Sequence, residues 1–358
     1  MTLAISSYRD LPAFEREGRL LNLAWTTDER EFLSANLAEV LRHELADELQ
    51  SDLPYVETYF VRDPYGEHIL RDAVSRLFAL DGLEFSISCG AGVNSLLHAL
   101  APLADGKPVY VIGDVYPDFP HWVARSGGTC TTQMSGESLD QYREGAHKAG
   151  SALVLIERPA LLAKDLSLRE LRELAGGVVR FGACVLIDES YANYYPPSFS
   201  AVRLVPEVAN LAVLRGLSKA YSLGGLRLGY CVASRSLTDR VRAAIPPMLA
   251  SSLSLRLARS VLGLGDVTKC LRERIVEAKI ETTRLLAQAG VTVAPQGSPY
   301  MPHLVCSSED AQEQVESRGI IGKMQPFWAG ESRQLYRLSV PLAPARVQQF
   351  RDRIGGHP

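Results

Sequence analysis

The sequence predicts an α/β protein: a largely parallel sheet covered by helices, followed by a smaller α+β part. Between about residues 85 and 235, short β-branched or aliphatic runs alternate with amphipathic stretches, as in strands joined by helical crossovers. From about residue 292, short strand-like runs instead surround a single helical segment. The chain has 358 residues, enough for roughly two domains with full hydrophobic cores.

Five runs in the first region are apolar almost throughout, which is expected for strands buried on both faces of a parallel sheet. These runs span 107–112, 151–156, 183–187, 211–215 and 228–233. The helices that cover such a sheet should carry apolar residues at every third or fourth position. Segments with that spacing span 67–80, 94–103, 167–174 and 236–245.

The second region begins after Pro246 and Pro247, which interrupt the helical pattern. Helices are expected over 252–264, 271–290, 309–319 and 344–355, and strands over 292–295, 302–306 and 335–340. Gly290 suits the end of the second helix. We expect three divisions that pack tightly, because no long Gly/Ser-rich or Pro-rich linker separates them. They are an N-terminal arm with part of the small domain over 1–40, a large domain over 41–247 and a small C-terminal domain over 248–358.

Composition points to a small-molecule partner. Lys and Arg number 38 against 41 Asp and Glu, so the net charge of −3 offers no basic surface for nucleic acid or an anionic membrane. No apolar run is long enough to span a membrane or to act as a secretory signal. Six scattered cysteines without a C-x-x-C pair indicate reduced thiols in the cytoplasm, and no metal-binding spacing is present.

One lysine has an unusual setting directly after the apolar run 211–215. The segment 215–230 reads RGLSKAYSLGGLRLGY and places Lys219 between small and hydroxyl residues. Taken by itself, a serine–lysine pair is more often an ordinary loop. A lysine at the carboxyl end of a parallel strand, near other positive groups, has a lowered pKa and can form a Schiff base with an aldehyde.

A second informative segment, 185–194, reads VLIDESYANY and places Asp188 at the end of a buried strand. Carboxyl ends of strands border the ligand-binding crevice of an open α/β sheet. The alternative for Asp188 alone is a turn or helix-cap aspartate. Tyr191 follows three positions later, which brings an aromatic hydroxyl to the same edge of the sheet.

Together the two segments resemble the fold type I pyridoxal-phosphate enzymes, specifically the class I/II aminotransferases and their histidinol-phosphate aminotransferase-like branch. The family's cofactor-lysine segment is matched at Ser218, Lys219, Ala220, Tyr221, Gly225, Arg227, Gly229 and Tyr230. Its strand-end motif is matched at Asp188, Glu189 and Tyr191, with Ser190 in place of the usual alanine. The resemblance implies a mainly parallel seven-stranded sheet, a small α+β domain, and pyridoxal 5'-phosphate as the cofactor.

The resemblance assigns catalytic roles to three residues. Lys219 would bind the cofactor aldehyde as a Schiff base and, once displaced by a substrate amine, move the proton at the substrate Cα. Asp188 would face the pyridine nitrogen and keep it protonated. Tyr191 would donate a hydrogen bond to the phenolic oxygen of the cofactor and help set the pKa of the Schiff base.

Other matched positions imply the remaining cofactor contacts. The phosphate would lie at a small-residue turn that runs into a helix, because the free amides of a helix N-terminus suit an anion. The implied phosphate contacts are Gly92, Val93, Asn94, Ser218 and Arg227. Relatives commonly carry an acidic or hydroxyl residue at the position of Val93, so Val93 would contribute through its backbone N–H alone. They often carry a further hydroxyl residue at the position of Gly216, so this chain would lack that phosphate contact.

Three further positions complete the implied site. Tyr116 lies where relatives stack an aromatic ring on the cofactor, with a core or interface ring as the alternative. Tyr65 corresponds to a tyrosine that reaches the neighbouring phosphate across a homodimer. Arg337 would bind the substrate carboxylate through two parallel hydrogen bonds. Candidates to read the substrate side chain are Trp25, Tyr59, Lys323 and Trp328.

One segment departs from the family. Relatives place an asparagine beside the cofactor's phenolic oxygen, but the equivalent stretch, 156–167, reads IERPALLAKDLS and would place Leu161 or Leu162 there. The resemblance implies foremost an aminotransferase that converts an L-α-amino acid to a 2-oxo acid through an external aldimine and a quinonoid. The missing asparagine favours an alternative with the same cofactor: a decarboxylase, or an elimination, replacement or cyclisation enzyme. A cofactor-free structural or regulatory homologue is a third possibility.

Overall fold

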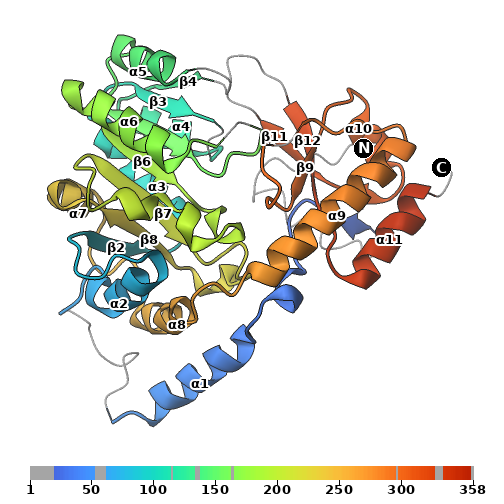
Figure 1. The fold of residues 1–358 in the computed structure, drawn as a ribbon, viewed down its shortest axis with the longest axis horizontal. Helices are drawn as coiled ribbons and strands as arrows, with labels where there is room; N and C mark the ends of the chain where they lie inside the picture. The colour runs from blue at the N-terminus through green and yellow to red at the C-terminus, as the bar shows by residue number, and fades with distance from the viewer. Residues whose placement is uncertain are drawn as a thin grey trace.

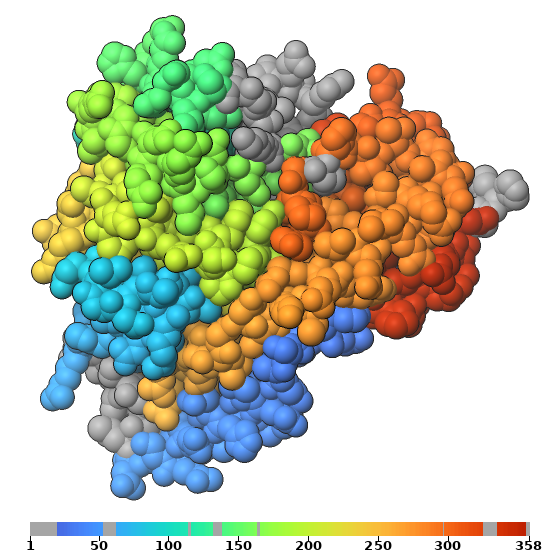
Figure 2. Space-filling model, in the orientation of Figure 1, coloured from blue at the N-terminus to red at the C-terminus, as the bar shows by residue number. Residues whose placement is uncertain are grey.

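The computed structural model describes residues 20–52, 62–113, 116–133, 138–162, 165–295, 297–326 and 334–355. Its larger part is built on a seven-stranded sheet and its smaller part on a three-stranded sheet (Figure 1). Helix α9 (Lys269–Gln288) connects them. Figure 2 shows orange surface, which includes α9, continuing from the large part into the small part.

The seven strands follow the order β2-β8-β7-β6-β5-β3-β4. Their bounds are β2 Ser86–Gly90, β3 Val109–Ile112, β4 Cys130–Gln133, β5 Leu153–Glu157, β6 Cys184–Asp188, β7 Leu211–Gly216 and β8 Gly229–Ala233. The neighbours from β4 to β7 are parallel, whereas β8 is antiparallel to both β7 and β2. The prediction of an α/β fold with a mainly parallel seven-stranded sheet is confirmed.

The direction of β8 corrects one expectation. The apolar run 228–233 was predicted to be a strand of the parallel sheet, but β8 is antiparallel to both of its neighbours. Parallel neighbours need a long crossover, usually a helix. The connection from β7 to β8 contains only the short 3-10 turn Gly224–Leu226, so the chain turns back antiparallel. This return loop carries Lys219.

Alternate residues of the strands face opposite layers of helices. In β7, Val213 packs in the same core as Leu70 and Leu174, while Leu214 packs with Leu97 on the other face. The first layer contains α2 (Glu67–Phe78), α5 (Leu139–Lys148), α6 (Leu168–Val178) and α8 (Ser252–Gly263). The second contains α3 (Val93–Leu100), α4 (Phe119–Arg125) and α7 (Thr238–Ala244). Helix α1 (Leu37–Gln50) lies along α8 (Figure 1).

Two strands of the large sheet were not predicted, for different reasons. Strand β2 reads SISCG and is buried at every position, but its small polar residues interrupt the apolar run by which a buried strand is predicted. Strand β4 reads CTTQ and, within the described ranges, pairs with β3 alone at the sheet edge, where a continuous apolar run is not required. Apolar continuity therefore indicates central strands better than edge strands or strands rich in small residues.

The smaller part, as far as the structure describes it, combines an antiparallel sheet with the helices α9, α10 (Ala311–Glu316) and α11 (Pro344–Gly355). Its strands are β9 (His303–Cys306), β11 (Lys323–Pro326) and β12 (Gln334–Ser339), in the order β11-β12-β9. A separate parallel pair joins β1 (Leu21–Asn22) to β10 (Ile320–Ile321). Helices α9, α10 and α11 pack on these strands through one buried cluster.

The predicted elements of this part hold with one correction. The expected strand 292–295 is reduced to a single bridge between Val293 and Cys306. Gly290 follows α9 with a φ of 84°, a conformation that favours glycine, as expected at a helix end. The predicted domain boundaries stay predictions. In the described ranges, no helix combines the length and apolar character needed to cross a membrane.

Candidate active site

Lys219 and Tyr191 lie together at the carboxyl ends of neighbouring parallel strands. Tyr191 follows β6 and Lys219 follows β7, and the two strands pair directly. The Nζ atom of Lys219 lies 4.9 Å from the centroid of the Tyr191 ring. This contact is a cation–π arrangement, in which the face of the ring stabilises the ammonium group. The chain therefore brings its candidate Schiff-base lysine against a phenol.

Asp188 lies at the end of β6, half-buried beside the same pair. Its Oδ1 atom accepts hydrogen bonds from the backbone N–H and the hydroxyl of Ser190, at 2.9 and 2.5 Å. Burial raises the pKa of Asp188, and the Ser190 bonds and the charge of Lys219 oppose that rise. A further cation placed against the carboxylate would lower the pKa, so the site suits a protonated ring nitrogen.

Arg227 closes over the N-terminus of α3. Its Nη2 atom donates to the carbonyl oxygen of Ala91 at 2.9 Å and to Oδ1 of Asn94 at 3.1 Å. The first-turn amides of a helix have no partner within the helix, and with the positive end of its dipole they attract anions. Arg227 has a φ of 51°, a costly conformation that is concentrated at functional sites.

Two glycines make room for this arrangement. A Cβ atom on Gly92 would lie 2.7 Å from Nη2 of Arg227, and one on Gly229 would lie 2.7 Å from the backbone nitrogen of Val93. Only residues without side chains allow the strand, the helix N-terminus and the guanidinium to approach so closely. The resulting cradle of amides and one guanidinium fits a phosphate group, which is the observation that supports pyridoxal phosphate here.

The departure at Gly216 has a structural explanation. A Cβ atom on Gly216 would lie 2.9 Å from Cγ2 of Val93. Val93 fills the volume that a hydroxyl side chain at position 216 would need, so the two departures from the family accommodate each other. The apolar valine and the missing hydroxyl are thus one feature of this site.

Arg337 approaches from the small sheet. It is buried, with 7% of its surface exposed, and its Nη2 atom donates to the carbonyl oxygen of Ala24 at 3.3 Å. Its strand β12 pairs with β9, so that Arg337 is opposite Val305. On the other side Arg337 is opposite Lys323 of β11, one of the residues suggested to read the substrate side chain.

The segment that lacks the family asparagine lies beside the site. Leu161 is buried against Met301 and Val305 of the small part, and the half-buried Leu162 and Tyr191 pack on the same cluster. An aliphatic surface therefore occupies this side of Tyr191. The expectation that Leu161 or Leu162 replaces the missing amide stays a prediction.

Two predicted cofactor contacts are explained by packing within the chain. Tyr116 stacks on Trp122, with ring centroids 5.6 Å apart. The hydroxyl of Tyr65 donates to the carbonyl oxygen of Arg242 at 3.3 Å, and the Arg242 guanidinium lies over its ring. Their roles at the cofactor stay predictions. Two of the residues suggested to recognise the substrate side chain, Tyr59 and Trp328, lie outside the described residues.

A cavity of about 590 Å³ opens on the Lys219 side of the site. Ser218, Lys219, Ser222 and Gly224 line one wall. The other wall comes from the N-terminal segment, namely Thr26, Thr27, Asp28, Arg30 and Glu31. Sequence reasoning missed this second wall, because it depends on the pairing of β1 with β10 rather than on any local motif.

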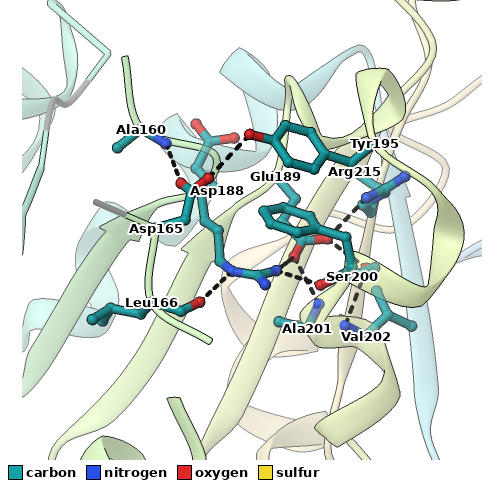
Figure 3. Close-up of polar contacts among 12 residues, drawn as sticks. Ala160, Asp165, Leu166, Asp188, Glu189, Tyr195, Ser200, Ala201, Val202 and Arg215 are labelled. Atoms are coloured by element: carbon teal, nitrogen blue, oxygen red, sulfur yellow. Dashed lines mark hydrogen bonds and ion pairs between the residues drawn. The ribbon is translucent and has the colours of Figure 1, made fainter. Parts of the chain in front are cut away.

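A buried ion cluster supports the site from behind (Figure 3). Glu189, next to Asp188, accepts hydrogen bonds from Nη1 of Arg158 and Nη1 of Arg215, both at 2.9 Å. The three side chains are almost fully buried, and Ser200 also donates to Glu189. The cluster ties together the ends of β5, β6 and β7. Neither arginine is among the positions matched to the family motifs, so the sequence did not indicate this support.

Comparison with known proteins establishes the family. The model for aminotransferase class I and II matches residues 62–349, which is most of the chain. This chain therefore belongs to the aminotransferase class I and II family. That assignment confirms the family resemblance noted in the sequence, and members of this family typically use pyridoxal phosphate.

Two individual relatives share about a third and about a quarter of their residues with this chain over the parts that align. An aromatic amino acid aminotransferase of Mycobacteroides abscessus is 34% identical over 40% of this chain, and the match spans 41% of that relative's length. A histidinol-phosphate aminotransferase of Pyrococcus furiosus is 25% identical over 66% of this chain and 68% of its own.

Solved structures share the fold along nearly the whole chain. One is a histidinol-phosphate aminotransferase of Sinorhizobium meliloti in complex with pyridoxal-5'-phosphate. It covers 99% of this chain and 96% of its own, with a TM-score of 0.72 and 17% identity. Another, L-threonine-O-3-phosphate decarboxylase of Porphyromonas gingivalis, covers 94% and 98% with a TM-score of 0.70 and 18% identity. These likenesses show the fold.

Proposed function

We propose that this chain is a pyridoxal-phosphate-dependent enzyme that acts on an L-α-amino acid, and foremost an aminotransferase that yields a 2-oxo acid. The observation that carries the proposal is the contact of Lys219 with Tyr191, beside the carboxylate of Asp188. These are the three catalytic residues of the proposal. Asp188 and Tyr191 belong to the segment at the end of β6, Lys219 follows β7, and the pairing of β6 with β7 brings the two segments together.

When bound, the cofactor supplies an electron-withdrawing ring that stabilises negative charge at the substrate Cα. Lys219 would hold it through Nζ and, once displaced, carry the proton that leaves Cα. The ring of Tyr191 lies under that ammonium group, and its hydroxyl would donate to the phenolic oxygen. Asp188 would keep the ring nitrogen protonated because its carboxylate is partly removed from water.

The remaining side chains bind and orient. Arg227 and the amides of Val93 and Asn94 would hold the phosphate, with Ser218 contributing its hydroxyl. Arg337 would hold the substrate carboxylate, since its guanidinium is buried with one described partner, a backbone carbonyl. Such charge-assisted contacts orient the substrate for proton removal at Cα.

Leu161 favours a second candidate function. Relatives place an asparagine amide beside the cofactor's phenolic oxygen, and Leu161, which packs against Met301 and Val305, would take its place in this chain. Without that amide, Tyr191 remains as the hydrogen-bond partner of the cofactor's phenolic oxygen. The loss of one hydrogen bond changes the pKa of that oxygen and of the Schiff base beside it. A non-transaminating outcome with the same cofactor, such as decarboxylation, elimination, replacement or cyclisation, is therefore the alternative.

A cytoplasmic homodimer completes the proposal. Tyr65 would reach the phosphate of the neighbouring subunit, and Tyr116 would stack on the cofactor ring. The six cysteines are unpaired in the structure, which supports a reducing compartment.

The function is tested by product analysis. The purified protein is loaded with pyridoxal phosphate and incubated with a panel of L-α-amino acids, and the released 2-oxo acid, ammonia and carbon dioxide are measured. Transamination predicts one 2-oxo acid for each cofactor that becomes aminated. Release of carbon dioxide or ammonia with the cofactor aldehyde retained would support the alternative. A Lys219→Arg variant keeps the charge and should lose either reaction.

A further inference from the structure

His303 is a buried histidine that the proposed chemistry leaves without a role. It begins β9, and only 2% of its surface is exposed. Its ring meets the ring of Tyr191 edge to face, with centroids 5.4 Å apart and an interplanar angle of 84°. Because Tyr191 contacts Lys219, one residue separates this imidazole from the candidate Schiff-base lysine.

One nitrogen of His303 is used and the other is not. Nδ1 lies 3.3 Å from the hydroxyl oxygen of Ser339, the residue opposite on β12. Nε2 is buried and has no hydrogen-bond partner among the described residues. A buried polar atom without a partner is costly in a folded protein, so its retention calls for an explanation such as a ligand.

The same face of the small sheet presents Arg337. His303 pairs with Ser339 and Val305 pairs with Arg337, and alternate residues of a strand share a face. His303 and Arg337 are therefore diagonal neighbours, within reach of one small ligand group. The Nε atom of Arg337 is likewise buried without a hydrogen-bond partner in the described part of the chain.

The charges around His303 favour a neutral ring beside a bound anion. Burial, followed by the charges of Arg337, Lys219, Lys279 and Lys323, holds the pKa of His303 well below its usual value. These cations come from β12, the loop after β7, α9 and β11. A neutral imidazole still donates one hydrogen bond, and four neighbouring cations make an anion the suitable acceptor.

We propose that His303 is a substrate-binding residue whose Nε2–H group donates a hydrogen bond to the carboxylate held by Arg337. Ser339 donates to Nδ1 and thereby fixes the tautomer in which Nε2 carries the proton. This inference rests on the proposed function, because Arg337 is the carboxylate site of that proposal. It adds a group that distinguishes substrates with a carboxylate from amines without one.

The test uses two reagents that need no knowledge of the natural substrate. Aminooxyacetate and methoxyamine both displace the Nζ amine of Lys219 from the cofactor aldehyde and form a carbon–nitrogen double bond to it. Only aminooxyacetate carries a carboxylate. The ratio of their second-order rate constants, followed by absorbance of the cofactor-loaded protein, therefore measures carboxylate recognition separately from reactivity of the site.

His303→Leu should lower this ratio about tenfold, because a hydrogen bond to a charged group is lost. His303→Gln retains an N–H donor and should stay within about threefold of the unmodified protein. Arg337→Gln should lower the ratio further, and the apolar neighbour variant Met301→Leu should leave it unchanged. An unchanged ratio in His303→Leu, or in His303→Phe if the leucine variant does not fold, would overturn the proposal.

A second measurement needs no cofactor. In protein with ¹⁵N-labelled histidine, the proposal predicts that His303 carries its proton on Nε2, and the opposite tautomer would contradict it. The two proposals fail in different ways. Protein that does not bind pyridoxal phosphate at Lys219 contradicts the proposed function, whereas loaded protein with an unaltered ratio in the His303 variants contradicts this inference alone.

Discussion

The ammonium nitrogen of Lys219 lies 4.9 Å from the centre of the Tyr191 ring, although the two residues belong to different segments of the chain. The pairing of β6 with β7 produces this contact. The ring faces the ammonium group, while the hydroxyl remains able to bond the cofactor. The two functions of Tyr191 can therefore be separated by substitution.

Tyr191→Phe keeps the ring and removes the hydroxyl. We expect cofactor binding to persist and kcat to fall about tenfold or more, because a hydrogen bond to an ionised oxygen contributes roughly 1.5–3 kcal/mol. Steady-state kinetics and the absorbance of the bound cofactor as a function of pH measure both effects. Tyr191→Leu, which also removes the aromatic face, should perturb the spectrum further. Unaltered kinetics in Tyr191→Phe would exclude the hydroxyl from the reaction.

Glu189→Gln tests the buried cluster behind the site. Removing the carboxylate leaves Arg158 and Arg215 buried without their counter-charge, so the free energy of unfolding should fall by about 3–5 kcal/mol. Glu84→Gln is the matched control, because Glu84 forms an exposed ion pair with Arg235 at the long distance of 3.9 Å. Its effect should stay below about 1 kcal/mol. Urea denaturation that gave both variants the same loss would contradict the assigned role.

Lys279 should make stability depend on alkaline pH. Its Nζ atom donates to the carbonyl oxygen of Ser298 at 2.7 Å, and burial lowers the pKa of Lys279 to about 8. Between that value and the ordinary lysine pKa of about 10.4, the unfolded chain binds more protons than the folded one. The contribution of Lys279 to the free energy of unfolding therefore rises as pH rises through this window.

The measurement compares the parent protein with Lys279→Met. From about pH 7 to about pH 10, the difference in free energy of unfolding should shift in favour of the parent by about 2 kcal/mol. Exposed lysines and tyrosines titrate in both proteins and cancel in the comparison. A difference that is constant with pH would mean that Lys279 keeps an ordinary pKa.

The accommodation of Val93 and Gly216 predicts a rescue. Gly216→Ser alone should destabilise the protein by about 1–3 kcal/mol, because its Cβ atom would lie 2.9 Å from the valine side chain. Val93→Ser should relieve the overlap in the double variant. The double variant should then bind pyridoxal phosphate at least as tightly as the parent, as measured by fluorescence titration. Additive losses in the two variants would contradict the steric explanation.

The sequence predicts the parts of this protein that lie in short contiguous patterns. Lys219 and Asp188 follow apolar runs that read as central strands, and their neighbours match a specific family motif. The antiparallel return of β8 was missed because an apolar run carries no information on strand direction. Direction depends on the length and content of the connection.

Residues whose importance depends on pairing over long distances were not found. Arg158 and Arg215 meet Glu189 only because three strands end at the same edge of the sheet. His303 joins Arg337 only through the register of β9 with β12. In the sequence, such residues look like isolated polar positions within apolar runs, and the register that unites them is a property of the folded sheet.

The central claim is that Lys219 carries the cofactor. The direct measurement is borohydride reduction of the protein loaded with pyridoxal phosphate, followed by proteolysis and mass spectrometry of the labelled peptide. We expect one pyridoxyl group per chain, on Lys219, and none on the buried Lys279. An adduct confined to another lysine, or a protein that carries none after loading, would contradict the account.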